Sequence, residues 1–191
     1  MNIGLFFGSF NPIHNGHLVI AGYLAEFSDL DQVWLVVSPH NPLKPAGSLL
    51  QDYHRLHLAE LGVGSYKKIK VSKIEFELPR PSYTVVTLAY LSDKFPQHRF
   101  SLIMGADNLD NLHKWKDYKV ILENHHIYVY PRPGCDGGEW RSHPSVVWTE
   151  APLMELSSSF IRQSIKEGKD VRYMLPESVY HFIDEMNFYK K

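Results

Sequence analysis

The segment GLFFGSFNPIHNGHLVIAGYLAEF (Gly4 to Phe27) contains two regular patterns joined by a short polar turn. Residues 3–7 form a continuous apolar run, which is typical of a strand buried on both faces. Ile20, Leu24 and Phe27 then recur at the spacing of one helical face. Between the two patterns lies GSFNPIHNGH, with two histidines three residues apart where the helix should begin. The segment therefore predicts a strand, a turn and a helix, as at the start of a parallel α/β sheet.

Strand-like and helical patterns alternate along the rest of the chain. Apolar runs that predict strands lie at 32–38, 69–78, 99–105, 126–130 and 145–150, and the run at 69–78 fits one strand or two. Helical spacing is found at 51–61, 82–95, 157–168 and 176–189. The loop PRPGCDGGEWRSHP between the last two strands is rich in Gly and Pro. This order is typical of βαβ units and a parallel sheet.

Length and composition fit one folded domain. The chain has 191 residues, of which 44% are hydrophobic and 21% charged, so we expect a single domain over 1–191. The alternation of elements predicts an α/β fold of the Rossmann-like, doubly wound kind. Its mainly parallel sheet should carry helices on both faces, with a small helical part at the C-terminal end.

The charge balance argues against binding to large polyanions. Lys and Arg together number 20 against 21 for Asp and Glu, so no overall field attracts nucleic acid or a membrane surface. The single cysteine, Cys135, fits a reducing compartment. No apolar run approaches the roughly 20 residues that span a bilayer, and the first residues do not read as a signal sequence. We therefore expect a cytoplasmic protein, whose oligomeric state the sequence leaves open.

The turn GSFNPIHNGH has the features of a phosphate-binding helix start. Gly8 permits a tight turn, and Gly16 leaves room for a ligand beside the backbone. His14 and His17 lie on one helical face. The free amides and dipole of a helix N-terminus favour phosphate, and two imidazoles add hydrogen-bond donors for charge that develops on it.

A second anion-binding helix start is predicted at SSSFIR. Ser157, Ser158 and Ser159 are good N-cap residues, and Arg162 follows one turn later on the same side. Lys44, on the loop after the second predicted strand, adds a further cation.

Each feature also has a purely structural interpretation. A serine run is commonly only a helix cap, and a second His-x-x-His pair in HRLH (54–57) reads as surface. No third ligand stands at metal-like spacing near either pair, so no protein-bound metal site is expected.

In sequence order, the motifs resemble the nucleotidyltransferase family with the His-x-Gly-His signature, and within it the nicotinate-nucleotide adenylyltransferases. GSFNPIHNGH resembles the first motif, although Phe7, Ser9 and Asn11 depart from its usual Gly, Thr and Asp. Further segments that match the pattern are PSYTVVTL (81–88), IMGADNLDNLHKW (103–115), YPRPG (130–134), LSSSFIR (156–162) and LPESVYHFI (175–183).

The resemblance implies transfer of AMP from ATP to the phosphate of nicotinate mononucleotide. The products are nicotinate adenine dinucleotide and pyrophosphate, in NAD biosynthesis. Mg²⁺ is expected to arrive with ATP, and no tightly bound organic cofactor is implied. The catalytic residues implied are His14, His17, Lys44 and Arg162. The ATP-binding residues implied are Gly8, Ser9, Phe10, Gly16, Gly105, Ser158, Ser159 and Ile161.

The acceptor side rests on a different set of residues. Trp115 is expected to stack on the pyridine ring, with Tyr118 as a weaker neighbour. Tyr83 and Thr84 would supply polar or backbone contacts. Asp107 would face a ribose or a phosphate-bound metal, and Arg132 would approach the nucleotide from its loop.

Other functions remain open at this point. The acceptor could be nicotinamide mononucleotide or phosphopantetheine, or the fold could serve a non-catalytic nucleotide sensor. A dehydrogenase is disfavoured because the first turn lacks the G-x-G-x-x-G pattern.

Overall fold

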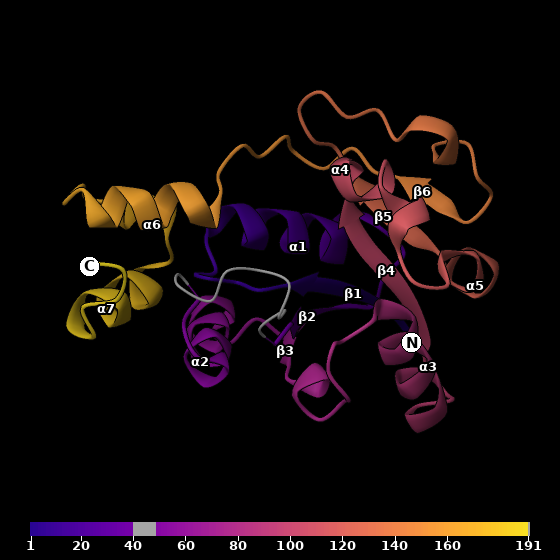
Figure 1. The fold of residues 1–191 in the computed structure, drawn as a ribbon, viewed down its shortest axis with the longest axis horizontal. Helices are drawn as coiled ribbons and strands as arrows, with labels where there is room; N and C mark the ends of the chain where they lie inside the picture. Colours follow the sequence, from indigo (N-terminus) through magenta and orange to yellow (C-terminus); the bar gives the residue numbers. More distant parts are fainter. Residues whose placement is uncertain (40–48, 191) are drawn as a thin grey trace.

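The computed structural model describes residues 1–39 and 49–190, and over these ranges the chain builds one six-stranded sheet. The strands run parallel throughout in the order β3-β2-β1-β4-β5-β6. The predicted doubly wound, mainly parallel sheet is therefore confirmed (Figure 1). The strands are β1 (Asn2–Gly8), β2 (Gln32–Val37), β3 (Ile69–Ser72), β4 (Arg99–Gly105), β5 (Ile127–Tyr130) and β6 (Val146–Trp148).

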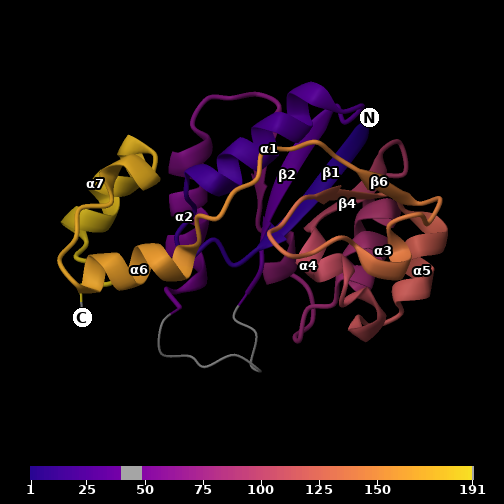
Figure 2. The same ribbon diagram turned by 90° about the horizontal axis from the view of Figure 1, so that it is seen from above.

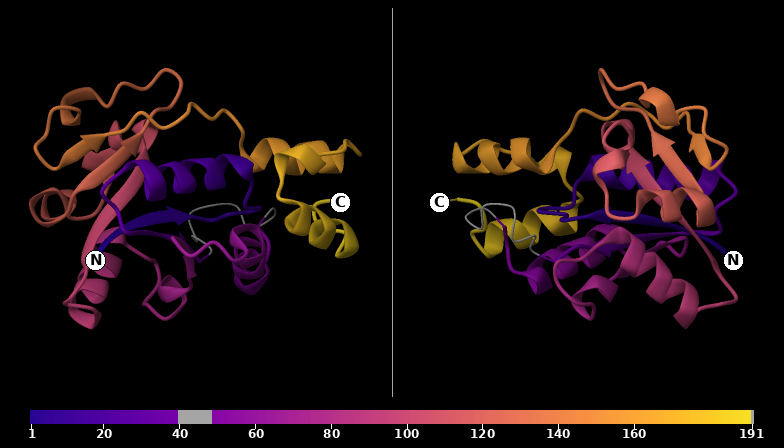
Figure 3. Two further views of the ribbon diagram at one scale, coloured as in Figure 1. Left: turned by 180° about the vertical axis from the view of Figure 1, so that it is seen from behind. Right: turned by 45° about the vertical axis from the view of Figure 1, so that its right-hand side comes forward.

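Helices cover both faces of the sheet, and the last two lie together at one end of the molecule, away from the N-terminus (Figures 1 and 2). The α-helices are α1 (Asn15–Phe27), α2 (Asp52–Val63), α3 (Thr84–Lys94), α4 (Ala106–Leu109), α5 (Tyr118–Asn124), α6 (Ser158–Lys166) and α7 (Glu177–Glu185). The 3-10 helices are η2 (Ile74–Phe76), η3 (Leu112–Lys114), η4 (Gly138–Trp140) and η5 (Arg172–Met174). Figure 3 shows α6 and α7 beyond the sheet, as the predicted small helical C-terminal part.

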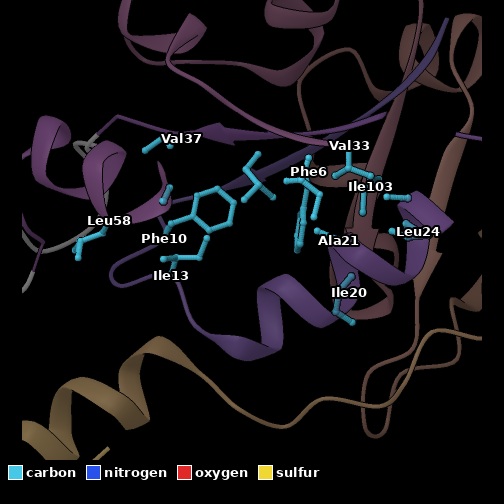
Figure 4. Close-up of a cluster of buried hydrophobic side chains, with 14 of the residues drawn as sticks. Phe6, Phe10, Ile13, Ile20, Ala21, Leu24, Val33, Val37, Leu58 and Ile103 are labelled. Atoms are coloured by element: carbon cyan, nitrogen blue, oxygen red, sulfur yellow. The ribbon is translucent and has the colours of Figure 1, made fainter. Parts of the chain in front are cut away.

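Alternating side chains of the central strand β1 enter two separate cores. Ile3 and Leu5 belong to the cluster that contains Leu88 and Leu91 of α3. Phe6 belongs to the other cluster, which α1 and α2 cover. Figure 4 shows this second cluster, in which Ile20 and Leu24 of α1 and Leu58 of α2 lie around the sheet side chains. A strand that buries both faces has no polar side to present, which explains the continuous apolar run in β1.

The segment 69–78 and the short helices α4 and α5 differ from the sequence expectation. Within 69–78 the structure has only the four-residue strand β3, after which the chain turns into η2, where the Phe76 N–H donates to the Lys73 carbonyl (2.8 Å). The seven-residue helix α5 was not predicted at all. It starts after Asp117, whose positive φ of 50° turns the chain sharply, and it is too short to show a helical period.

The strand order places a ligand-binding edge at the middle of the sheet. The chain connects outward from β1 toward β2 and from β4 toward β5, so the connections diverge between the C-terminal ends of β1 and β4. In open α/β sheets ligands bind at such a switch point. Gly8 ends β1 and Gly105 ends β4, so both lie at this edge. Among the helices of the described ranges, none is long and apolar enough to cross a membrane.

Candidate active site

A cavity of about 600 Å³ opens at the switch point between β1 and β4. Its floor is formed by β1 and β4, and its walls come from the turn after β1, the segment before α3, and the start of α6. The predicted site residues that line it are Gly8, Ser9, Thr84, Gly105, Trp115, Ser158, Ser159 and Arg162. Residues predicted for the ATP and for the acceptor thus share one cavity.

The two histidines of the first turn lie against each other, and neither is among the residues that line the cavity. His14 is the N-cap of α1, and its ring stacks on that of His17 with a centroid separation of 3.7 Å. The main-chain N–H of His14 donates to His17 Nδ1 (3.3 Å). Because Nδ1 accepts, the proton of a neutral His17 ring resides on Nε2, which makes Nε2 the donor atom of the ring. His14 is buried, and its Nδ1 has no hydrogen-bond partner in the part of the chain that the structure describes.

Both imidazoles are held in the neutral form. Burial, and secondarily the positive charge of Arg132, lower the pKa of His14 to about 4. Burial also lowers the pKa of His17 well below its usual value, with the neighbouring His14 and Arg132 acting in the same direction. A neutral pair at physiological pH can donate hydrogen bonds to a phosphate.

The start of α6 is joined directly to the turn that leads into α1. Ser158 Oγ donates to the Pro12 carbonyl (2.9 Å), and Arg162 Nη1 donates to the Asn11 carbonyl (2.8 Å). Arg162 Nη2 also donates to Ser159 Oγ (3.2 Å). The N-terminus of α6, the turn after β1 and one guanidinium are therefore held together at the same end of the cavity, an arrangement suited to a polyphosphate.

Three of the predicted ATP-binding residues do not line the cavity, and these are Phe10, Gly16 and Ile161. Phe10 is 1% exposed, and its ring packs edge-on against Phe6 and His17. Ile161 is fully buried in the core. A Cβ at Gly16 would come within 3.0 Å of His14 Nδ1, so this glycine leaves room for the imidazole. Lys44 lies outside the described residues.

The acceptor side of the cavity contains two of the predicted residues. Trp115 lines the cavity and also packs against the core beneath it. Thr84, the first residue of α3, lines it as well. Tyr83 lies outside the lining, with Lys116 Nζ 4.4 Å from the centre of its ring. Tyr118 also lies outside it, against Trp140 at a ring separation of 5.6 Å.

Asp107 and Arg132 form an ion pair at the edge of the site. Arg132 Nε is 3.5 Å from Asp107 Oδ1, and Arg132 Nη1 donates to the Met154 carbonyl (3.0 Å). Neither side chain is among the residues that line the cavity. Arg132 affects the pKa of both histidines, so its charge acts on the side of the first turn. A Cβ at Gly105 would meet Asp107 Oδ1, the end of an exposed side chain that can move aside, and would come within 3.1 Å of Tyr130 and Arg132.

Arg55, which no sequence pattern indicated, binds the loops around the cavity to one another. Arg55 is fully buried, and its Nη1 donates to the carbonyls of Ser9 (2.6 Å) and Ser38 (2.7 Å). Its Nε donates to the Leu50 carbonyl (3.1 Å), and its Nη2 pairs with Asp52 Oδ1 (2.6 Å). This residue lies in HRLH, whose polar character alone indicates surface. Only the tertiary structure shows that the guanidinium points inward.

Ser38, Glu75 and Ser82 also line the cavity, although no motif singled them out as site residues. Ser82 Oγ is buried without a hydrogen-bond partner among the described side chains and backbone. Glu75 is 3% exposed and accepts a hydrogen bond from Thr87 Oγ1 (2.9 Å). Glu75 belongs to the segment expected to be a strand, and the 3-10 helix that replaces the strand carries it to the cavity.

The comparison with protein families gives the class of the protein. The cytidylyltransferase-like family matches residues 5–164, a range that contains both the first turn and the start of α6. The chain belongs to this family of nucleotidyltransferases.

Relatives of high identity extend over the whole chain. A protein of Flavobacterium johnsoniae named probable nicotinate-nucleotide adenylyltransferase is 58% identical over 193 residues, which cover 100% of both chains. A protein of Cytophaga hutchinsonii with the same name is 48% identical, over 99% of this chain and 98% of its own length.

Solved structures share the fold at low sequence identity. The nicotinic acid mononucleotide adenylyltransferase of Plasmodium falciparum, complexed with NaAD, matches with a TM-score of 0.81 at 17% identity. The match covers 99% of this chain and 97% of that one. A putative nicotinate-nucleotide adenylyltransferase from Vibrio parahaemolyticus has a TM-score of 0.74 at 20% identity, covering 100% and 96% of the two chains.

Proposed function

We propose that this nucleotidyltransferase transfers the adenylyl group of ATP to the phosphate of nicotinate mononucleotide, which yields nicotinate adenine dinucleotide and pyrophosphate. One observation carries the proposal: a single cavity holds a phosphate-binding end, built from the turn after β1 and the start of α6, and an aromatic end at Trp115. The full-length relatives named nicotinate-nucleotide adenylyltransferase support the choice of substrates.

The reaction needs positioning and charge stabilisation more than activation of a nucleophile. The acceptor phosphate is already an anion, so no general base and no covalent intermediate are required. Its oxygen attacks the α-phosphorus of ATP, the bond from that phosphorus to the bridging oxygen breaks, and pyrophosphate carries away the electron pair. The protein must hold the two phosphates in line and stabilise the charge that builds on the oxygens around the reacting phosphorus.

His14 and His17 are proposed to stabilise this charge. In the free protein both rings are neutral, and His17 carries its proton on Nε2, so it can donate to a phosphate oxygen without a prior proton transfer. The stacked arrangement and the bond from His14 N–H fix the ring of His17 before substrate arrives. Such preorganised donors require no rearrangement at the moment of reaction.

Arg162, with Ser158 and Ser159, is proposed to hold the β- and γ-phosphates. The guanidinium already bonds the Asn11 carbonyl, which keeps it beside the first turn. Its remaining donors and the free amides of α6 provide positive potential for departing pyrophosphate. Lys44 is proposed to assist in holding these phosphates because it is a cation on the loop after the second predicted strand.

At the other end, the face of Trp115 is proposed to receive the pyridine ring. Thr84 and the free amides at the start of α3 are proposed to bind its carboxylate. Tyr83, Asp107, Tyr118 and Arg132 remain proposed acceptor contacts, which from their present places would require side-chain movement toward the cavity.

Mg²⁺ fits this site as a companion of ATP. In the described ranges there is no group of three or more His, Cys, Asp or Glu side chains that could hold a metal ion. Mg²⁺ is commonly bound through substrate phosphates and water with few protein ligands, and this chain offers a polyphosphate site of that kind. When bound, the ion would neutralise phosphate charge.

The proposal is tested by following labelled phosphorus. ATP labelled at the α-phosphate should pass its label to a dinucleotide when nicotinate mononucleotide is present, and ATP labelled at the γ-phosphate should pass it to pyrophosphate. Release of labelled orthophosphate, or an α-label that stays in free AMP, would refute adenylyl transfer. His17→Ala should lose most of the turnover while keeping its folded structure, as judged by circular dichroism and thermal unfolding.

A further inference from the structure

A buried hydrogen-bond chain connects the two ends of the cavity through Glu75. Its carboxylate, on η2, accepts from Thr87 Oγ1 (2.9 Å) and is hydrogen-bonded to the side chain of Ser38. Ser38 follows β2, and its N–H donates to the Gly8 carbonyl (2.9 Å) at the end of β1. Thr87 lies one turn into α3, the helix whose first residue, Thr84, lines the acceptor end.

Core packing already ties these elements together, because Leu5 of β1 and Leu88 of α3 share one apolar cluster, and the hydrogen bonds of Glu75 add a polar link at the cavity itself. The first turn follows β1, whereas α3 joins β3 to β4, so the two ends of the cavity belong to segments far apart in the chain. Transfer between two bound nucleotides demands that the attacking oxygen and the phosphorus approach to about 3–3.5 Å in line. The reaction is therefore sensitive to the separation of these segments.

Charge considerations make the position of Glu75 unusual. A carboxylate lines a cavity that we propose holds two anionic nucleotides, where a further negative charge does not assist binding. The side chain is 3% exposed, and burial raises its pKa, while the hydrogen bonds from Ser38 and Thr87 act against this effect. A buried acid of this kind is retained more readily for its hydrogen bonds than for its charge.

We propose that Glu75 is a positioning residue for the adenylyl transfer: its two hydrogen bonds hold the start of α3 at a fixed distance from the turn after β1. The proposal rests on the proposed function, because it assigns the two ends of the cavity to the two nucleotides. Glu75 does not need to touch either substrate, and its effect is transmitted through Ser38 and Thr87.

The test compares variants that remove or keep the two hydrogen bonds. Glu75→Met keeps the chain length and removes both acceptors, whereas Glu75→Gln offers an amide that can bond both hydroxyls after they rotate. Glu77→Met changes an exposed glutamate two residues away and serves as the matched control. Each variant is examined for thermal unfolding, for the separate Kd of nicotinate mononucleotide and of a non-hydrolysable ATP analogue, and for kcat.

Glu75→Met should lower kcat about 10- to 100-fold, the order expected when reacting groups are misplaced by up to 1 Å. Each nucleotide alone should bind within about threefold of the wild-type affinity, because each end of the cavity stays intact. Glu75→Gln should recover most of the lost kcat, and Glu77→Met should match the wild type. Thr87→Val should reproduce the loss from the other side of the bond, and Thr87→Ser should restore it.

Several results would overturn the proposal. A folded Glu75→Met protein with wild-type kcat would remove any positioning role, and a large rise in Kd for one nucleotide would make Glu75 part of that binding site. If Glu75→Gln were as slow as Glu75→Met, the charge and not the hydrogen bonds would matter. If Glu75→Met does not fold, the comparison of Thr87→Val with Thr87→Ser decides the question. If the wild-type protein shows no adenylyl transfer, the proposed function itself is wrong. That result differs from a failure of the positioning role alone, in which the wild type is active and Glu75→Met is equally active.

Discussion

Replacing Gly16 by alanine should separate catalysis from stability. The added Cβ would lie 3.0 Å from His14 Nδ1 and 3.1 Å from His14 Cε1, whereas ordinary contacts of this kind begin at 3.4 Å. The ring cannot retreat freely, because it is buried and stacks on His17 at a centroid separation of 3.7 Å. The His14 ring must therefore shift by about 0.4 Å, and if a 1 Å misplacement lowers the rate about 10²-fold, this shift lowers kcat about sixfold.

Gly22→Ala is the matched control for this substitution. It lies in the same helix, and no atom outside its own helix backbone and chain neighbours comes within 4 Å of the added Cβ. Alanine there should stabilise the protein by up to about 1 kcal/mol through helix propensity, which raises Tm by about 2–4 °C for a chain of this size. Steady-state pyrophosphate release and thermal unfolding are measured for both variants. A Gly16→Ala protein that keeps wild-type kcat would refute the claim that the His14 ring must stay where the structure places it.

Three further predictions follow from the site. The folded pKa of His14, about 4, lies below its unfolded value of 6.5, so the unfolded chain binds more protons between these values. The free energy of unfolding should therefore fall by about 2 kcal/mol between pH 7 and pH 5 if the shift is fully expressed, and urea denaturation of wild type and His14→Asn at these two pH values checks the slope. Arg162→Ala should raise KM for ATP about 10- to 100-fold through loss of charge-assisted hydrogen bonds, with a much smaller effect on KM for the acceptor; equal effects on both would contradict its assignment. Trp115→Ala should raise KM for nicotinate mononucleotide about 5- to 100-fold through lost stacking, while Trp140→Ala, outside the cavity lining, should not.

The parts of the fold that the sequence predicts are those with a local cause. The apolar run of β1 and the glycine turn before His14 each reflect a requirement of a few consecutive residues, and both are found where expected. The helix at Thr84–Lys94 was also predicted despite its β-branched residues, because Leu88 and Leu91 keep the helical spacing. Some of the residues that the family motifs predict for ATP and the acceptor line one cavity at the edge of the sheet.

Other site features depend on contacts between distant segments and could not be predicted in this way. Arg55 and Glu75 are polar residues in segments whose local pattern gives no sign of burial, and they are buried because loops from several strands meet around them. The places of Tyr83 and Tyr118 also follow from tertiary packing: Tyr83 lies beneath Lys116 and Tyr118 lies against Trp140, outside the cavity lining.

The most direct test of the account is the acceptor preference of the wild-type protein. Pyrophosphate release from ATP and Mg²⁺ is measured separately with nicotinate mononucleotide, nicotinamide mononucleotide and phosphopantetheine, and kcat/KM is compared. The account predicts a strong preference for nicotinate mononucleotide, since its carboxylate would meet Thr84 and the free amides of α3. A preference for either other acceptor would contradict the acceptor site, and no release with any of the three would contradict adenylyl transfer altogether.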